Sequence, residues 1–222
     1  SFWVPFFLTM ANSTNYTTET ELSSVNSILG AIGQSPINKI FNLNADKELV
    51  YVNPEISFVH NILLETCKDV QNEGWVFNRE DDYPISPDSE GFVLIPKNVL
   101  RMDITAGQIW RMTDVVRREG KLYDKVHHTY VFDRPIRCNI TWQFAYDDLP
   151  SVFQKYITYR ASVTAATQLT ASSELTQLLS KKENEARASC VEYECNQGNY
   201  TYFGWPAGTS YRSYQPYNVL QR

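Results

Sequence analysis

The stretch from Glu183 to Trp205, ENEARASCVEYECNQGNYTYFGW, gathers side chains that could do chemistry. Its thiols and carboxylates are groups that bind metal ions or transfer protons. On a helix each residue turns about 100°, so Cys190 and Cys195 would lie roughly 140° apart and could not share one face. No other cysteine or histidine stands at the spacing typical of metal ligands: these are Cys67, Cys138, His60, His127 and His128. We therefore expect free, mostly buried thiols, no metal site and no cofactor.

Acidic residues beside aromatic ones raise a second possibility. The segment NREDDYP holds Glu80, Asp81 and Asp82, and YDD holds Asp147 and Asp148. A glycosidase needs two carboxylates that face each other across a sugar. Clustered acids at a turn are more often solvated turn formers, which is our interpretation of these. The chain has no phosphate-binding, zinc-protease or serine-hydrolase motif. We predict no catalytic residues, with an envelope-glycan hydrolase or a fibre-binding module in the β region as the alternatives.

The two adjacent histidines, His127 and His128, fall in a run that is typical of a strand. Neighbouring residues on a strand point to opposite faces, so we expect surface positions and no joint site. The net charge of −5 excludes the basic footprint of a protein that grips nucleic acid. Hydrophobic residues make up 43% of the 222 residues, enough for a packed core, and aromatic residues reach 14%.

Helical periodicity flanks a β-rich middle. Residues 18–74 predict two helices, the first capped by Thr18 and the second by Asn53 with Pro54 in its first turn. A connector with short strands joins them. Residues 75–146 alternate short β-branched runs with turn residues, which indicates five to seven antiparallel strands. Residues 147–197 predict two more helices. The fold class is α+β: a four-helix bundle with an antiparallel β domain inserted between helices 2 and 3.

The last predicted helix, from about residue 173 to 196, explains most charges of the opening stretch. Glu183 and Arg187 are spaced for an i,i+4 pair on a solvated face. The apolar face is expected to contain Leu175, Leu178, Leu179, Ala186, Cys190 and Tyr193.

Both ends of the chain lie outside these helices. Residues 1–17 are interpreted as an N-terminal arm, in which the nine residues before Met10 are either an upstream addition or an interface segment. Residues 198–222 have no periodicity and many aromatic side chains, so they form an extended C-terminal arm that becomes ordered by binding elsewhere.

Four segments in a fixed order resemble one family. ELSSVNSILGAIGQSPI, NEGWVFN, YDDLPSVFQKYITYRAS and ENEARASCVEYECNQGNY look like the tail tubular protein A family, head-to-tail adaptors of short-tailed phages. The resemblance implies a structural, non-enzymatic protein of the virion tail, assembled in the cytoplasm of the bacterial host. It also implies a ring of about twelve copies between the portal and the tail nozzle protein, tail tubular protein B.

The same resemblance suggests further partners. It implies contact with a tail fibre and passage of phage DNA through the ring without sequence-specific binding. It also implies that the C-terminal arm reaches the portal. An aromatic arm can anchor itself on a neighbouring ring by burying its large side chains. The expected anchors are Tyr200, Tyr202, Phe203, Trp205, Tyr211, Tyr214 and Tyr217.

Overall fold

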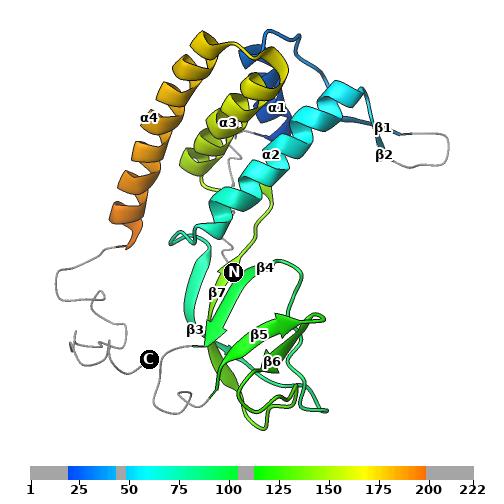
Figure 1. The fold of residues 1–222 in the computed structure, drawn as a ribbon, viewed down its shortest axis with the longest axis vertical. Coiled ribbons are helices and arrows are strands. Elements are labelled where there is room, and N and C mark those ends of the chain that lie inside the picture. The colour runs from blue at the N-terminus through cyan, green and yellow to red at the C-terminus, as the bar shows by residue number, and fades with distance from the viewer. Residues whose placement is uncertain (1–19, 44–48, 105–112, 199–222) are drawn as a thin grey trace, which may run out of the picture.

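The computed structural model describes residues 20–43, 49–104 and 113–198. Helices occupy one end of the molecule and most strands the other (Figure 1). The predicted mixed α+β fold with four helices and antiparallel strands is confirmed. The predicted N-terminal arm and the seven aromatic anchors of the C-terminal arm lie outside the described residues.

The first two helices begin at side-chain caps. Helix α1 spans Glu21–Ala31, and its N-cap is Thr20, whose hydroxyl accepts a hydrogen bond from the Ser23 amide. Thr18, the predicted cap, lies outside the described residues. Helix α2 spans Pro54–Asn72 and is capped by Asn53, as predicted.

A short ribbon connects these two helices. Strand β1 (Phe41–Leu43) pairs antiparallel with β2 (Leu49–Tyr51), and the ribbon projects from the helical end (Figure 1). The predicted short strands of the connector are therefore present.

Between α2 and α3, the described residues form five strands. Strands β3 (Arg79–Ile85), β7 (Ile136–Trp142) and β4 (Val99–Ile104) form an antiparallel sheet with β7 in the centre. Strands β5 (Val115–Arg118) and β6 (Lys121–Asp124) form a separate hairpin. Buried residues from these strands and from the segment before β4 make their own small core: Val93, Ile95, Val99, Val115, Leu122, Ile136, Cys138 and Ile140.

The β region departs from two predictions. Glu80, Asp81 and Asp82 lie on strand β3 rather than in a turn: Glu80 pairs with Ile140 of β7, and Asp81 and Asp82 form the irregularity in register between Glu80 and Tyr83. His127 and His128 lie in a turn after β6 rather than on a strand. The Asp124 carboxylate accepts bonds from the amides of residues 126 and 127, which fixes that turn.

The chain returns to the helical end through a short 3-10 helix, Tyr146–Asp148, and then forms α3 (Ser151–Ala165). A π-helical turn, Ala166–Thr170, precedes helix α4 (Ser173–Gly198). Ala171 between them has a φ of 51°, in the left-handed region, and this reverses the chain direction. The predicted apolar face of α4 is correct at Leu179 and Cys190 but wrong at Leu178, which is 64% exposed.

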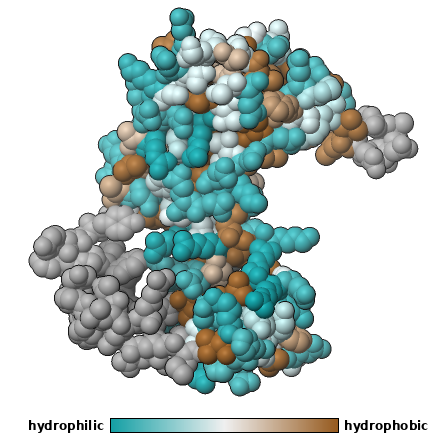
Figure 2. Space-filling view, in the orientation of Figure 1, coloured by the Kyte–Doolittle hydropathy of each residue, from teal (hydrophilic) through white to brown (hydrophobic). Residues whose placement is uncertain are grey.

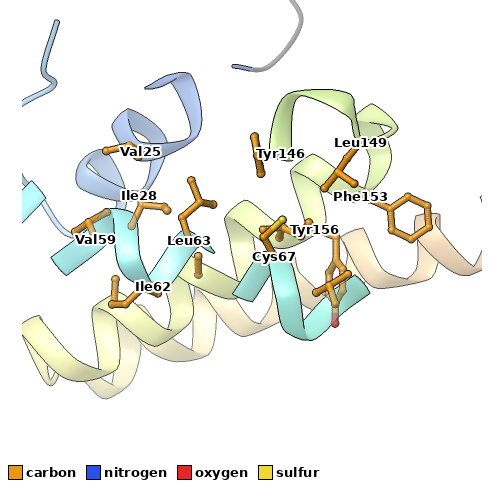
Figure 3. Close-up of a cluster of buried hydrophobic side chains, with 14 of the residues drawn as sticks. Val25, Ile28, Val59, Ile62, Leu63, Cys67, Tyr146, Leu149, Phe153 and Tyr156 are labelled. Atoms are coloured by element: carbon orange, nitrogen blue, oxygen red, sulfur yellow. The ribbon is translucent and has the colours of Figure 1, made fainter. Parts of the chain in front are cut away.

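One hydrophobic core unites the four helices (Figure 3). Its most enclosed members come from different helices: Val25 and Ile28, Val59 and Leu63, Phe153 and Tyr156, and Cys190. Tyr146 links them by polar contacts, because its hydroxyl lies 2.6 Å from Ser24 Oγ and donates to the Gln154 carbonyl. Trp75 and Tyr146, which bound the predicted 75–146 β segment, both pack in this helical core.

Candidate functional site: the junction of helices and sheets

The chain crosses between its helical and β ends twice, and Gln71 ties the two crossings together. Gln71 is fully buried near the end of α2. Its side-chain amide donates to the Phe144 carbonyl at 3.1 Å, and its oxygen accepts from the Phe144 amide at 2.8 Å. The side chain thus pairs with the backbone as a neighbouring strand would. Because residue 144 follows β7, this pair fixes where the sheet leaves the helices.

Asn78 makes a second connection from the other crossing. Its side-chain amide donates to the carbonyls of Gln71 at 2.8 Å and Trp142 at 2.9 Å. Its side-chain oxygen accepts from the Trp75 amide at 2.9 Å. Asn78 is only 1% exposed, so each of these bonds is shielded from water. Gln71 and Asn78 therefore hold α2, the 74–78 turn and the end of β7 in one arrangement.

An aromatic cluster covers this turn. Gly74 has a φ of 79° and ends α2 as predicted, since this conformation favours glycine. Trp75 follows, with its ring centroid 4.9 Å from that of Phe153 on α3. Its indole N–H donates to the Val70 carbonyl at 2.8 Å. Phe77 lies 4.6 Å from the same Phe153 ring, so the turn is packed on helix α3.

An arginine-carboxylate cluster joins α4 to the same place. Arg187 Nη2 donates to Glu73 Oε2 at 3.0 Å, and Arg187 Nη1 donates to Glu73 Oε1 at 3.2 Å. The Tyr156 hydroxyl accepts from Arg187 at 2.7 Å and from Arg160 at 3.2 Å. Hydrogen bonds with Glu73 and Tyr156 raise the pKa of Arg187. The predicted Glu183–Arg187 pair is wrong, because the guanidinium turns toward Glu73 at the end of α2.

An acidic residue of α4 also binds the junction. Both oxygens of Glu194 accept the amide hydrogen of Val76 at 3.0 Å. Charge-assisted bonds to backbone amides are stronger than neutral ones. Sequence reasoning placed Arg187 on a solvated face and missed Gln71, Glu73, Asn78 and Glu194. The signal that could have found them is the polar run around Gly74, whose partners are distant in sequence.

Burial makes three of the four thiols unreactive. Cys67, Cys138 and Cys190 are free and buried, as predicted, and Cys195 is free and exposed. Burial raises the pKa of Cys138 and of Cys190 to about 12, so neither thiol is ionised at neutral pH. No three His, Cys, Asp or Glu side chains of the described residues cluster as metal ligands would.

The acids of β3 do not face each other as a catalytic pair. The Glu80 carboxylate accepts from the Trp142 indole at 3.1 Å, whereas Asp81 pairs with Arg79 at 3.2 Å on the other face. Asp82 sits at the register irregularity with a φ of 60°. Asp147 caps the other end of the molecule: it accepts a bond from the Glu21 amide at 2.9 Å, at the start of α1.

Comparison with known proteins adds a family to this geometry. A model of the family described as "Tail tubular protein" matches residues 22–200, most of the chain. The chain belongs to the tail tubular protein family. It is also similar to tail tubular protein A of Klebsiella phage KP34, with 25% identity over 131 residues. That alignment covers 59% of this chain and 62% of the phage KP34 protein.

Membership of the tail tubular protein family gives the chain a structural role in a phage tail. The family match also bears on the junction between the helices and the sheets. The segments NEGWVFN, YDDLPSVFQKYITYRAS and ENEARASCVEYECNQG, on which the resemblance depends, supply Glu73, Trp75, Tyr156, Arg187 and Glu194. These segments meet at one place, where they fix the helices against the sheets. None of the helices within the described ranges is long and apolar enough to cross a membrane.

Proposed function

We propose that this tail tubular protein is an adaptor whose copies form a ring, of about twelve, between the portal and the tail nozzle protein. In this proposal the phage genome leaves through the central channel of the ring. The observation that carries it is the family match over residues 22–200, combined with a fold whose two ends have separate cores.

Two separate ends suit a protein that must contact two different partners. We assign the four helices and the inserted β domain to opposite neighbours, with the junction of Gln71, Asn78 and Arg187 between them. Because the junction residues are buried or paired, a force applied to one end is transmitted to the other with little change in the angle between the two ends. An adaptor between two rings needs this property more than it needs a catalytic pocket.

The charge of the chain is compatible with a DNA channel. At −5 for each chain, twelve copies carry roughly −60 before screening. Phosphate groups of DNA have the same sign, so the ring as a whole does not hold the genome electrostatically. Salt limits this repulsion to about 10 Å.

The C-terminal arm is proposed as the portal contact. Residues 198–222 hold the seven aromatic anchors from Tyr200 to Tyr217. They lack the aliphatic side chains for a core of their own, so the cost of ordering them falls at assembly. Ordering at that stage suits an adaptor that attaches only after the phage head has been filled. The β domain is left free to contact the nozzle or a fibre.

Native mass spectrometry and electron microscopy of the protein mixed with its portal test the proposal. We expect a ring attached to the portal. A chain that stays monomeric and never joins the portal would refute the adaptor function. Deletion of residues 201–222 should leave the circular dichroism of the folded protein intact but abolish attachment. A truncated protein that still attaches to the portal would refute only the proposed role of the arm.

A further inference from the structure

The helical end carries a projection whose outer face has exposed apolar side chains. The β1–β2 ribbon extends from the helices on the side away from α4 (Figure 1). Leu49 is 67% exposed, Val50 41% and Val52 42%. Hydrophobic side chains beside the ribbon are visible on the surface in Figure 2. Large apolar residues grouped on a projection are typical of a contact surface.

The ribbon is held rigidly from its inner face. The Tyr51 hydroxyl lies 3.0 Å from His60 Nδ1, and His60 Nε2 donates to the Glu21 carboxylate at 2.8 Å. The Phe41 ring packs 4.8 Å from Tyr51 and 5.5 Å from the buried His60. Alternation along β2 directs Val50 away from Tyr51, toward solvent. A ribbon that is already ordered loses little entropy when it binds.

A recess of matching character lies between α1, α3 and α4. The groove has a volume of 550 Å³. Its apolar wall includes Ala31 of α1, Tyr159 of α3 and Leu175 and Leu178 of α4. Leu178 is 64% exposed there, although it lies in the second turn of α4 beside the buried Leu179. The groove thus leaves a leucine uncovered at the place where a neighbouring chain could cover it.

The groove and the ribbon side differ in charge. Lys181 and Lys182 are exposed at the rim of the groove, where Glu185 is also part of the lining. On the ribbon side Glu55 is exposed in the first turn of α2, and Phe58, 39% exposed, lies one turn further on the same face. Within residues 20–43, 49–104 and 113–198, Glu55, Lys181 and Lys182 form no ion pair. A contact between the two surfaces would therefore bring complementary unpaired charges together.

We propose that the β1–β2 ribbon of one copy enters the α1–α3–α4 groove of the next copy. The inference rests on the proposed ring and names the surfaces through which its copies bind. Because a projection and a recess are different surfaces, the contact is head-to-tail, and repeating it closes a ring when the rotation allows. Val50 covers Leu178, and Glu55 approaches Lys181 and Lys182 at the rim.

Two aspartate variants test the contact by mixing. Val50→Asp damages only the ribbon and Leu178→Asp only the groove, and both positions are exposed enough to preserve the fold. Each variant alone should need at least ~10 times more protein than the parent to assemble, because the contact would bury an unpaired charge. Mixed together, they should form 1:1 dimers, since one intact ribbon meets one intact groove and the remaining surfaces are both damaged.

Disulfide trapping in assembled tails separates this inference from the ring itself. The variant Val50→Cys, Leu178→Cys is made in a Cys195→Ser background, which removes the exposed native thiol. Oxidation should give a ladder of linked multimers on a non-reducing gel. The control replaces Val50→Cys with Leu94→Cys, which is 62% exposed against 41% for Val50 but lies in the β region, and it should give no ladder.

The outcomes are distinct. Tails that assemble normally but give no ladder, or aspartate variants that assemble like the parent protein, would overturn the ribbon-and-groove contact while the adaptor ring stands. A parent protein that forms no ring with its portal would refute the proposed function itself. A ladder together with 1:1 dimers in the mixture would support both.

Discussion

Replacing the buried Gln71 should weaken the connection between the helical and β ends more than any exposed change of equal size. Gln71→Met keeps the length and most of the volume of the side chain. It removes the donor and the acceptor that pair with the backbone of Phe144 at 3.1 and 2.8 Å. The backbone amide and carbonyl of residue 144 then have no partner from this helix.

The expected loss of stability follows from those two groups. A buried polar group left without a partner costs about 1–3 kcal/mol. The Phe144 side chain is 37% exposed, so water reaches part of this backbone and reduces the penalty. Methionine also offsets some of the loss by filling the site with apolar atoms. We therefore expect Gln71→Met to lower the free energy of unfolding by about 2 kcal/mol.

Urea denaturation followed by far-ultraviolet circular dichroism measures this change. Gln177→Met is the matched control, because Gln177 is exposed on α4 and the same substitution there should shift stability by less than ~0.5 kcal/mol. Hydrogen exchange adds a local readout: the amide of Phe144 should lose protection in the first variant only. Equal unfolding midpoints for the two variants would refute the idea that Gln71 links the two crossings.

Other predictions follow from single contacts. Leu179→Ala should cost about 2–5 kcal/mol in urea denaturation, whereas Leu178→Ala, its exposed neighbour, should cost less than ~0.5 kcal/mol. Arg187→Met should lower the urea midpoint only modestly, since the Arg187 side chain is 46% exposed. Burial raises the pKa of Asp124, but hydrogen bonds from the His127 side chain and from the amides of Val126 and His127 outweigh it, so the pKa lies below its ordinary value of 3.8. Asp124 therefore stabilises the fold above that pH and loses this effect as the pH falls through its lowered pKa, so Asp124→Asn should destabilise the protein at neutral pH and match the parent in acid.

The sequence was sufficient wherever local rules decide the structure. Asn53 before Pro54 fixes the start of α2, and Gly74 fixes its end, because caps and left-handed turns depend on a few neighbouring residues. Alternation and turn residues also identified the antiparallel strands. The same rules failed at His127, because the Asp124 carboxylate folds the following residues into a turn that β-branched composition does not reveal.

The junction could not be predicted because its partners are far apart in the chain. Arg187 has an acid four residues before it, which suggests a pair within α4, yet the structure pairs it with Glu73, 114 residues away. Leu178 and Leu179 illustrate the same limit. Helical periodicity allows either residue on the apolar face, and the packing of α3 against α4 decides that only Leu179 is buried.

The position of the junction explains how the family resemblance can rest on residues that bind one another and the backbone. Residues that catalyse a reaction must meet at a substrate, whereas Glu73, Trp75, Arg187 and Glu194 meet at the point where the chain changes from helices to sheets. Their polar groups form hydrogen bonds with backbone groups and with one another. Such residues specify an angle between two ends of a molecule. In the proposed ring that angle would have to be the same in every copy, because small differences would accumulate and prevent the ring from closing.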